Sequence, residues 1–223
     1  MKDLLIVIDG PAGAGKTTVS RALAERLHYR YIDTGALYRG VAWEILENGI
    51  DPEDEDGMAE LLGNLDLRFE RTEKGTRLFS SGVDITDYIR TPRVTMLASA
   101  ASAKPAVRKA LLGLQREMGK RKAAVFEGRD MGTVVFPDAD VKFFLTADLR
   151  ERARRRFEEL KDTNPQSLEQ VEQEMRQRDA NDSSRDAAPL RPADDAIMID
   201  STGKSVAGVV EEMAGSVSAA AGR

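Results

Sequence analysis

A glycine-rich segment near the N-terminus has the residue types and the spacing of a phosphate-binding loop. Gly10 to Thr17 reads G-P-A-G-A-G-K-T and matches G-x-x-x-x-G-K-[ST] at every fixed position. The glycines let backbone N–H groups converge on phosphate oxygens, and a following helix adds the dipole of its N-terminus. Lys16 can reach the terminal phosphates of ATP, and the Thr17 hydroxyl can bind Mg²⁺, which prefers oxygen ligands. The residues expected to contact ATP are Gly10, Pro11, Ala12, Gly13, Ala14, Gly15, Lys16, Thr17 and Thr18.

The elements around this loop predict an α/β fold. Leu4–Ile8 is continuously apolar, as in a parallel strand buried on both faces, and a helix is expected from Thr17 to about Leu27. Further strands are expected at Tyr31–Ile32, Ala123–Glu127, Val141–Thr146 and Ala196–Ile199. Because helical sequence separates these strands, they predict a doubly wound parallel sheet of five strands.

A second, smaller sheet is expected at about residues 62–90. Leu65–Phe69 and Arg77–Phe79 have β-like patterns and are separated by the turn signal Glu73–Gly75, and Val83–Ile89 can add a third strand. This pattern predicts an antiparallel β insertion. An irregular loop with chance alternation is the alternative.

Arginines follow the fourth strand on a helix expected from Asp148 to about Lys161, before a turn at Asp162–Pro165. Helical spacing places Arg156 beside Leu149 on the apolar face, with Arg152 at the same edge, whereas Arg154 points to solvent. An inward pair of arginines suits a helical lid over phosphates, because planar guanidinium groups bind phosphate well. The alternative is that their aliphatic stems cover the core while the charged groups reach water.

Other charged residues have spacing or positions that suit a second phosphate. Arg178, Asp182 and Arg185 share one face if a helix that opens at Ser167 continues that far. They can hold a phosphate and a sugar hydroxyl, or form an ion-pair ladder on the surface. Arg129 and Asp130 follow the third strand, at the sheet edge where ligands bind in such folds.

Composition excludes several classes of protein. The chain has 223 residues, 41% hydrophobic and 32% charged residues, and a net charge of −5. A slightly acidic balance gives no reason to expect nucleic acid or an anionic membrane as partner. Cysteine is absent, which excludes disulfides, thiolate catalysis and cysteine-based metal sites. We expect a cytoplasmic protein, since no signal-peptide pattern or apolar span is present.

The phosphate-binding loop does not by itself specify a reaction. A GTPase would need an Asn-Lys-x-Asp segment to read guanine, and the sequence has none. An ATPase motor or transporter domain is typically larger. The small size and the arginine-rich second half favour a kinase of small metabolites.

The motifs together resemble the bacterial cytidylate kinase family of CMP/dCMP kinases. They are IDGPAGAGKTT, DTGALYR at 33–39, GRDMGTVVFPDADVKFFLTA at 128–147, ERARRR, RDANDSSRDAAPL at 178–190, and DAIMIDST. The resemblance runs in consistent order from about Leu4 to Val217, and the 62–90 insertion resembles the three-stranded excursion of that family. It implies a P-loop kinase fold.

The resemblance implies a role for each matching position. Thr34, Arg108 and Asp130 match positions that read cytosine, and Arg39, Arg129 and Arg185 match contacts to the acceptor phosphate. Arg178 and Asp182 match contacts to the sugar, and Tyr38 lies within the matching DTGALYR segment. Lys16, Arg129, Arg152, Arg156 and Arg185 are the expected catalytic residues, and Thr17 is the expected metal ligand. Two positions differ slightly from the family pattern: Thr34 stands in place of Ser, and Glu127 stands where relatives can carry Asp.

The expected reaction is ATP + CMP (or dCMP) → ADP + CDP (or dCDP) with Mg²⁺, in a monomer that binds small nucleotides. The expected organisation is one kinase unit, with a core at about 1–32, 104–148 and 190–223, an acceptor-binding region at about 33–103, and a lid at about 149–189. Two alternatives stay open. One is another small P-loop kinase, acting on a different nucleoside monophosphate or on dephospho-coenzyme A. The other is a nucleotide-binding module without catalysis.

Overall fold

The computed structural model describes residues 2–73, 75–160 and 166–222, and two compact units make up the chain. One unit comprises Met1–Tyr31 with Arg121–Arg223, and the other comprises Ile32–Lys120. The predicted helix end at Lys161 and the turn at Asp162–Pro165 lie outside the described residues.

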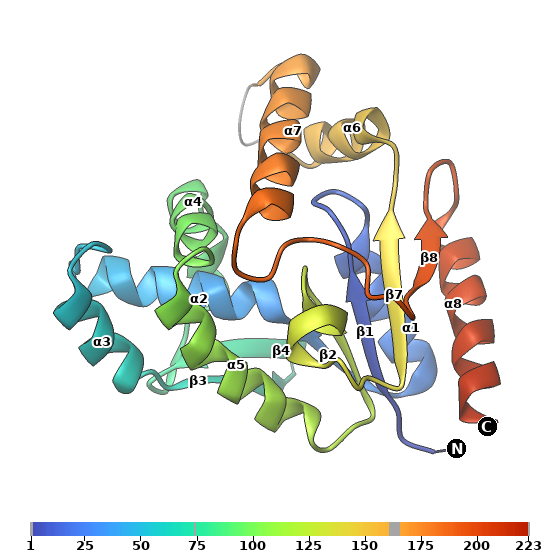
Figure 1. The fold of residues 1–223 in the computed structure, drawn as a ribbon, viewed down its shortest axis with the longest axis horizontal. Coiled ribbons are helices and arrows are strands. Elements are labelled where there is room, and N and C mark those ends of the chain that lie inside the picture. Colours follow the sequence, from blue (N-terminus) through green and yellow to red (C-terminus); the bar gives the residue numbers. More distant parts are fainter. Residues whose placement is uncertain (1, 74, 161–165, 223) are drawn as a thin grey trace. The chain divides into compact units, whose positions relative to one another are not determined.

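The predicted main sheet is present, with strand order β2-β6-β1-β7-β8. The strands are β1 (Leu5–Asp9), β2 (Arg30–Asp33), β6 (Ala124–Glu127), β7 (Val141–Thr146) and β8 (Ile197–Asp200). β1 pairs in parallel with β6 and β7, and β7 pairs in parallel with β8 (Figure 1). The chain passes from β6 to β7 across β1, so the carboxyl end of β1 lies at a crossover point, where ligands bind in open α/β sheets.

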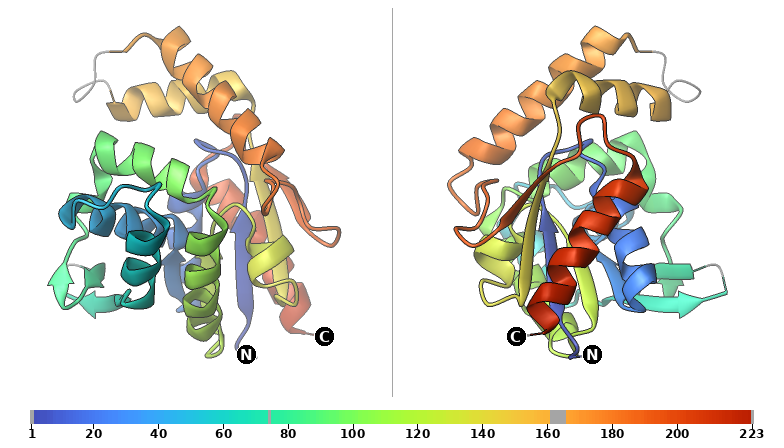
Figure 2. Two further views of the ribbon diagram at one scale, coloured as in Figure 1. Left: turned by 60° about the vertical axis from the view of Figure 1, so that its left-hand side comes forward. Right: turned by 90° about the vertical axis from the view of Figure 1, so that its right-hand side faces the viewer.

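Two helices cover one face of this sheet. Helices α1 (Lys16–Leu27) and α8 (Val206–Ala221) pack together. Their apolar side chains form one buried cluster with alternate residues of the strands, and Figure 2 shows α8 running along the sheet. Side chains of the intervening strand residues point to the opposite face, where the rings of Phe126 and Phe136 meet edge to face at 4.7 Å. The sheet is therefore buried on both faces, as its continuous apolar strands predict.

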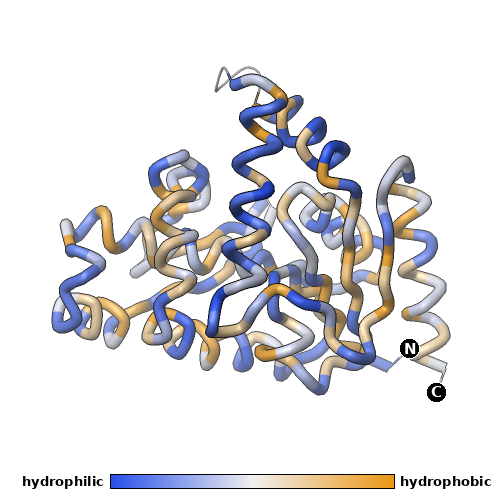
Figure 3. Tube along the Cα trace, turned by 45° about the horizontal axis from the view of Figure 1, so that its top comes forward, coloured by the Kyte–Doolittle hydropathy of each residue, from blue (hydrophilic) through white to orange (hydrophobic). Residues whose placement is uncertain are grey.

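Helices α6 (Leu149–Leu160) and α7 (Leu168–Ser184) form a pair after β7. Ser167 caps α7 through a capping box with Gln170. The two helices share a small buried cluster around Ala153, Val171 and Met175, and most of α7 is hydrophilic (Figure 3). A short helical turn, η2 (Met131–Val135), follows β6.

The second unit has its own core. Its helices are α2 (Thr34–Glu47), α3 (Glu55–Gly63), α4 (Pro92–Ala101) and α5 (Pro105–Gly119), with a helical turn η1 (Tyr88–Arg90). Buried side chains from these helices and from residues 67–85 form one cluster, which includes Leu37, Ile45, Leu78 and Leu111. This cluster gives the unit an apolar interior separate from that of the main sheet.

The predicted antiparallel insertion is present in the second unit. It consists of β3 (Leu67–Thr72), β4 (Gly75–Ser80) and β5 (Val83–Asp84) in the order β3-β4-β5. The third strand is shorter than the predicted Val83–Ile89, because the Asp84 carboxylate accepts a hydrogen bond from Thr86 N (3.1 Å) and turns the chain. Within the described ranges, no helix combines the length and apolar character that crossing a membrane requires.

Candidate active site

The glycine-rich loop joins β1 to α1 at the crossover point of the sheet, as predicted. Gly10 has φ 146°, and a Cβ there would lie 1.9 Å from Leu145 O, so no other residue fits. Gly15 precedes α1 in the left-handed region, with φ 88°. The loop backbone therefore approaches β7 closely and turns directly into the helix N-terminus, as a phosphate-binding loop requires.

Lys16 is buried at this loop. Its ammonium group donates hydrogen bonds to Gly10 O (2.8 Å) and Pro11 O (2.7 Å). Burial lowers the pKa of Lys16 well below its ordinary value, and the positive charge of Arg129 lowers that pKa further. Arg178 acts in the same direction, so three cationic groups gather where phosphates are expected.

Thr17 lies beside a carboxylate that the predicted site does not include. The Thr17 hydroxyl donates to Glu127 Oε1 (2.9 Å), and the Tyr31 hydroxyl donates to the same oxygen. Glu127 is buried at the end of β6. The described residues contain no group of three or more His, Cys, Asp or Glu able to hold a metal ion. Mg²⁺ bound to nucleotide needs fewer protein oxygens, because phosphates and water fill its other positions, so Thr17 and Glu127 fit that ion.

The two predicted lid arginines of α6 have different surroundings. Arg152 is buried and donates to Ala147 O (2.9 Å), to Ala12 O in the loop (3.1 Å) and to Asp179 of α7 (2.7 Å). Arg156 does not share that buried face, contrary to the helical-spacing argument. Its side chain is 44% exposed and pairs with Glu159 at 2.9 Å, because Arg152 and Ala153 occupy the side that packs against α7.

Arg155, which the sequence argument passed over, is the other α6 arginine that reaches the loop. It donates to Ser201 Oγ (3.0 Å) and Ser201 O (2.8 Å), and Ser201 Oγ donates to Ala14 O (3.1 Å). Arg154 is exposed, as predicted, and pairs with Glu151. α6 is thus joined to the phosphate-binding loop at Ala12 through Arg152 and at Ala14 through Arg155 and Ser201.

Asp182 brings two of the predicted arginines together. Arg129 Nε donates to Asp182 Oδ2 (3.1 Å), and Arg185 NH1 lies 3.7 Å from Asp182 Oδ1. Helix α7 ends at Ser184, and Arg185 has an extended backbone with ψ 139°, so the expected continuous helix face does not extend to Arg185. Arg185 still points to Asp182, because its Nε donates to Ala188 O (2.6 Å) in the loop that follows.

Asp130 is buried directly after Arg129, and a second acidic residue lies near it. The Asp9 carboxylate, at the end of β1, accepts hydrogen bonds from Met131 N (2.9 Å) and Gly132 N (2.8 Å). Burial raises the pKa of Asp9 to about 6, and the charge of Asp130 acts in the same direction, against the two backbone hydrogen bonds. Asp9 was not predicted, because a polar residue that ends a strand has no distinctive pattern.

The remaining predicted residues lie in the second unit, near the start of α2. Thr34 is its buried first residue, and Asp33 caps the helix by accepting from Ala36 N (3.1 Å). Asp33 also accepts from Arg39 NH2 (2.8 Å). Arg108 stacks on the Tyr38 ring at 5.7 Å and donates to Ser102 O (3.1 Å). Within this unit, Arg39 therefore contacts the cap of α2, and Arg108 contacts Tyr38.

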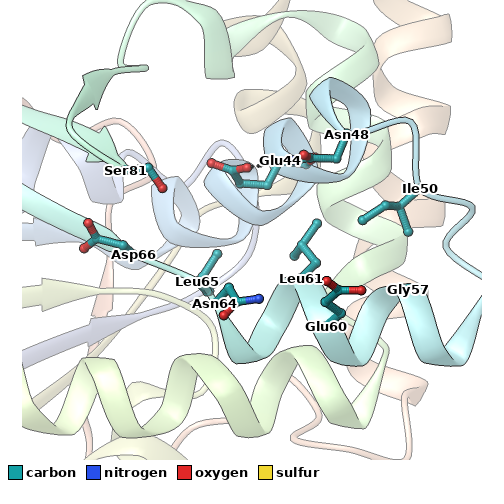
Figure 4. Close-up of a pocket in the computed structure, with 10 residues that line it drawn as sticks. All are labelled: Glu44, Asn48, Ile50, Gly57, Glu60, Leu61, Asn64, Leu65, Asp66 and Ser81. Carbon is teal, nitrogen blue, oxygen red and sulfur yellow. Dashed lines mark hydrogen bonds between the residues drawn. The ribbon is translucent and has the colours of Figure 1, made fainter.

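A cavity of ≈ 400 Å³ also lies within the second unit, near the opposite end of α2 (Figure 4). Its lining includes Glu44 and Asn48 of α2, Glu60 of α3, and Asp66 and Ser81 at the ends of the antiparallel strands. The Glu44 carboxylate is bound by Ser80 and Asn48. None of the predicted site residues lines this cavity, so it is not the expected acceptor site.

A parallel sheet whose first strand leads into a complete phosphate-binding loop, followed by arginine-rich helices, defines the P-loop kinase fold. The family model described as Cytidylate kinase matches residues 6–219. The chain belongs to the cytidylate kinase family.

Curated relatives match almost the whole chain. The cytidylate kinase of Geobacter sulfurreducens is 48% identical over 213 residues, covering 95% of this chain and 91% of the relative. The cytidylate kinase of Exiguobacterium sp. is 46% identical over 211 residues, covering 94% of each. Among solved structures, an uncharacterized protein from Eubacterium ventriosum has the same fold, with a TM-score of 0.57 and 13% identity over 98% of this chain and 99% of that chain.

Proposed function

We propose that this chain transfers the γ-phosphoryl group of ATP to the 5′-phosphate of CMP or dCMP, giving ADP and CDP or dCDP. The observation that carries the proposal is the group of cations at the loop. Lys16 is buried at the loop, and the charges of Arg129 and Arg178 lower its pKa. The carboxylates of Glu127 and Asp9 offset part of this positive charge, and two phosphate groups that meet in line would offset more of it. Membership of the cytidylate kinase family supports cytidine as the acceptor nucleoside.

On the donor side, backbone N–H groups of the Gly10–Thr18 segment bind the phosphates of ATP, and Pro11, which has no N–H group, contacts the nucleotide without donating. Lys16 stabilises the transferred group, together with Arg152 and Arg156 of the lid. The exposed guanidinium of Arg156 is free of core packing, so it can turn to a bound phosphate when its contact with Glu159 breaks. Thr17, with Glu127 beside it, would hold Mg²⁺. The ion neutralises charge on the phosphates when it is bound.

On the acceptor side, we assign Arg39, Arg129 and Arg185 to the phosphate of CMP. Arg178 and Asp182 bind its sugar, and the remaining assigned residues, which bind its nucleoside, are Thr34, Tyr38, Arg108 and Asp130. An ionised Asp130 accepts a hydrogen bond from the N4 amino group of cytosine but faces the O4 of uracil unfavourably. The base is therefore selected by attraction of one amino group and repulsion of the corresponding oxygen.

Each region of the chain has its own role in this reaction. Residues of about 33–103 bind the acceptor, about 149–189 form the lid, and the rest form the core. We expect a monomer that acts in the cytoplasm, where ATP is plentiful. Size-exclusion chromatography with light scattering measures the molar mass in solution, and so tests whether the protein is a monomer.

A coupled assay of ADP release with a panel of acceptors tests the proposed reaction. CMP and dCMP should give the highest kcat/KM, UMP less, and AMP or dephospho-coenzyme A little. Rapid ADP release with no acceptor would indicate an ATPase. A preference for dephospho-coenzyme A would assign the chain to another kinase reaction, and no release with any acceptor would favour a binding module.

A further inference from the structure

Asp9 connects the phosphate-binding loop to the segment that carries Asp130. It is the last residue of β1 and directly precedes Gly10. Its side chain is buried, with only 3% of the residue exposed. Asp9 belongs to none of the groups assigned above to ATP, CMP or Mg²⁺.

The end of β1 holds the segment 128–132 at both of its ends. Gly128 N donates to Ile8 O (3.1 Å), before Asp130. After Asp130, Met131 N donates to Asp9 Oδ1 (2.9 Å) and Gly132 N donates to Asp9 Oδ2 (2.8 Å). Because these bonds hold the backbone on both sides of Asp130, they set the direction in which its Cα–Cβ bond leaves the chain, and so the region that its carboxylate can reach.

A carboxylate suits this task better than another polar side chain of the same size. Its two oxygens accept from two consecutive N–H groups and present no donor to either of them. The amide of Asn has one acceptor oxygen, and its NH₂ group would face an N–H group. A carboxylate occupies this position although burial and the nearby Asp130 disfavour its charge, and its two backbone hydrogen bonds favour that charge.

We propose that Asp9 is a positioning residue that sets the orientation of Asp130 and thereby the choice between CMP and UMP. The inference rests on the proposed function, since it concerns selection of the acceptor base. The strand β1, which leads into the ATP-binding loop, would then have a second role: it would hold the carboxylate of Asp130 in place to read the base.

The test compares Asp9→Asn with the wild-type enzyme in kcat/KM for CMP and for UMP. We expect the CMP/UMP ratio to fall roughly tenfold, the scale of one lost buried hydrogen bond, through a higher KM for CMP. The ratio does not depend on how much of the enzyme is folded, so loss of stability alone would not move it.

Asp140→Asn is the matched control. Asp140 accepts from Leu5 N (2.7 Å) at the other end of β1 and from Lys122 (2.8 Å), so this variant makes the same substitution at another carboxylate that contacts the backbone of the strand. It should leave the CMP/UMP ratio unchanged. Asp9→Ser, which keeps one acceptor oxygen, repeats the test if Asp9→Asn does not fold.

An unchanged CMP/UMP ratio in a folded Asp9 variant would overturn the positioning role. So would an equal change in the Asp140 control. A wild-type enzyme inactive with CMP would instead refute the proposed function, so the two failures are distinguishable.

Discussion

The pH dependence of stability gives a sharp prediction about the buried Asp9 carboxylate. Burial raises its pKa from 3.8 to about 6 in the folded chain. The folded state therefore binds this proton more tightly than the unfolded state. Between those two pKa values, the free energy of unfolding must fall as the pH rises. A shift of this size corresponds to about 3 kcal/mol in total, at 1.36 kcal/mol per pKa unit.

The perturbation is Asp9→Asn, which removes the titrating group and leaves the other carboxylates in place. Urea unfolding of both proteins is followed by circular dichroism from pH 4.5 to 7.5. The wild-type free energy of unfolding minus that of the variant should fall by about 2 kcal/mol across this range, since part of the total change occurs below pH 4.5. Loss of the backbone hydrogen bonds adds an offset that does not depend on pH.

Asp140→Asn serves as the control. For this variant, the difference in the free energy of unfolding should change with pH in the opposite direction. Burial raises the pKa of Asp140, but its hydrogen bond from Leu5 and its contact with Lys122 outweigh burial and lower the pKa overall. Its stabilising contribution is lost as the pH falls, so the same difference should rise with pH. A flat or rising difference for Asp9→Asn would refute the account of Asp9 as a carboxylate held in an unfavourable buried site.

Three further predictions concern transfer and base selection. Lys16→Ala should abolish transfer and leave the circular dichroism spectrum unchanged, whereas Lys120→Ala, which removes an exposed lysine, should retain wild-type kcat. Asp130→Asn should narrow the CMP/UMP ratio of kcat/KM by roughly one to two decades, mainly through lost CMP activity, and an unchanged ratio would place base reading elsewhere. Arg152→Ala should lower both Tm and kcat, because three hydrogen bonds to Ala147, Ala12 and Asp179 are lost, whereas Arg154→Ala should change the free energy of unfolding by less than about 0.5 kcal/mol.

The sheet and the phosphate-binding loop could be predicted because their signals are local. Leu4–Ile8 is apolar at every position, and the loop that follows has fixed glycine spacing. Each of these two patterns is contained within a few consecutive residues, so it can be recognised without knowledge of tertiary contacts. The length of β5 was harder to predict, because the contact between Asp84 and Thr86 that turns the chain competes with a run of residues that also suits a strand.

The directions of the α6 arginines could not be derived from helical spacing. An arginine has a long side chain, and its direction depends on the partner that it finds. Arg155 binds Ser201, which is 46 residues away in the chain, whereas Arg156 finds Glu159 within its own helix. The hydrogen bond from Thr17 to Glu127 likewise depends on the pairing of β1 with β6, where Ile8 lies opposite Glu127. Such contacts follow from tertiary structure, which single-sequence periodicity does not contain.

The fate of the γ-phosphoryl group distinguishes direct transfer to CMP from hydrolysis of ATP. The enzyme is incubated with [γ-³²P]ATP, Mg²⁺ and CMP, and the labelled products are separated by chromatography. Direct transfer predicts that the label appears in the β-position of CDP, at the rate of ADP formation, and that Lys16→Ala forms none. Label recovered mainly as inorganic phosphate, or in a product other than CDP, would contradict the account.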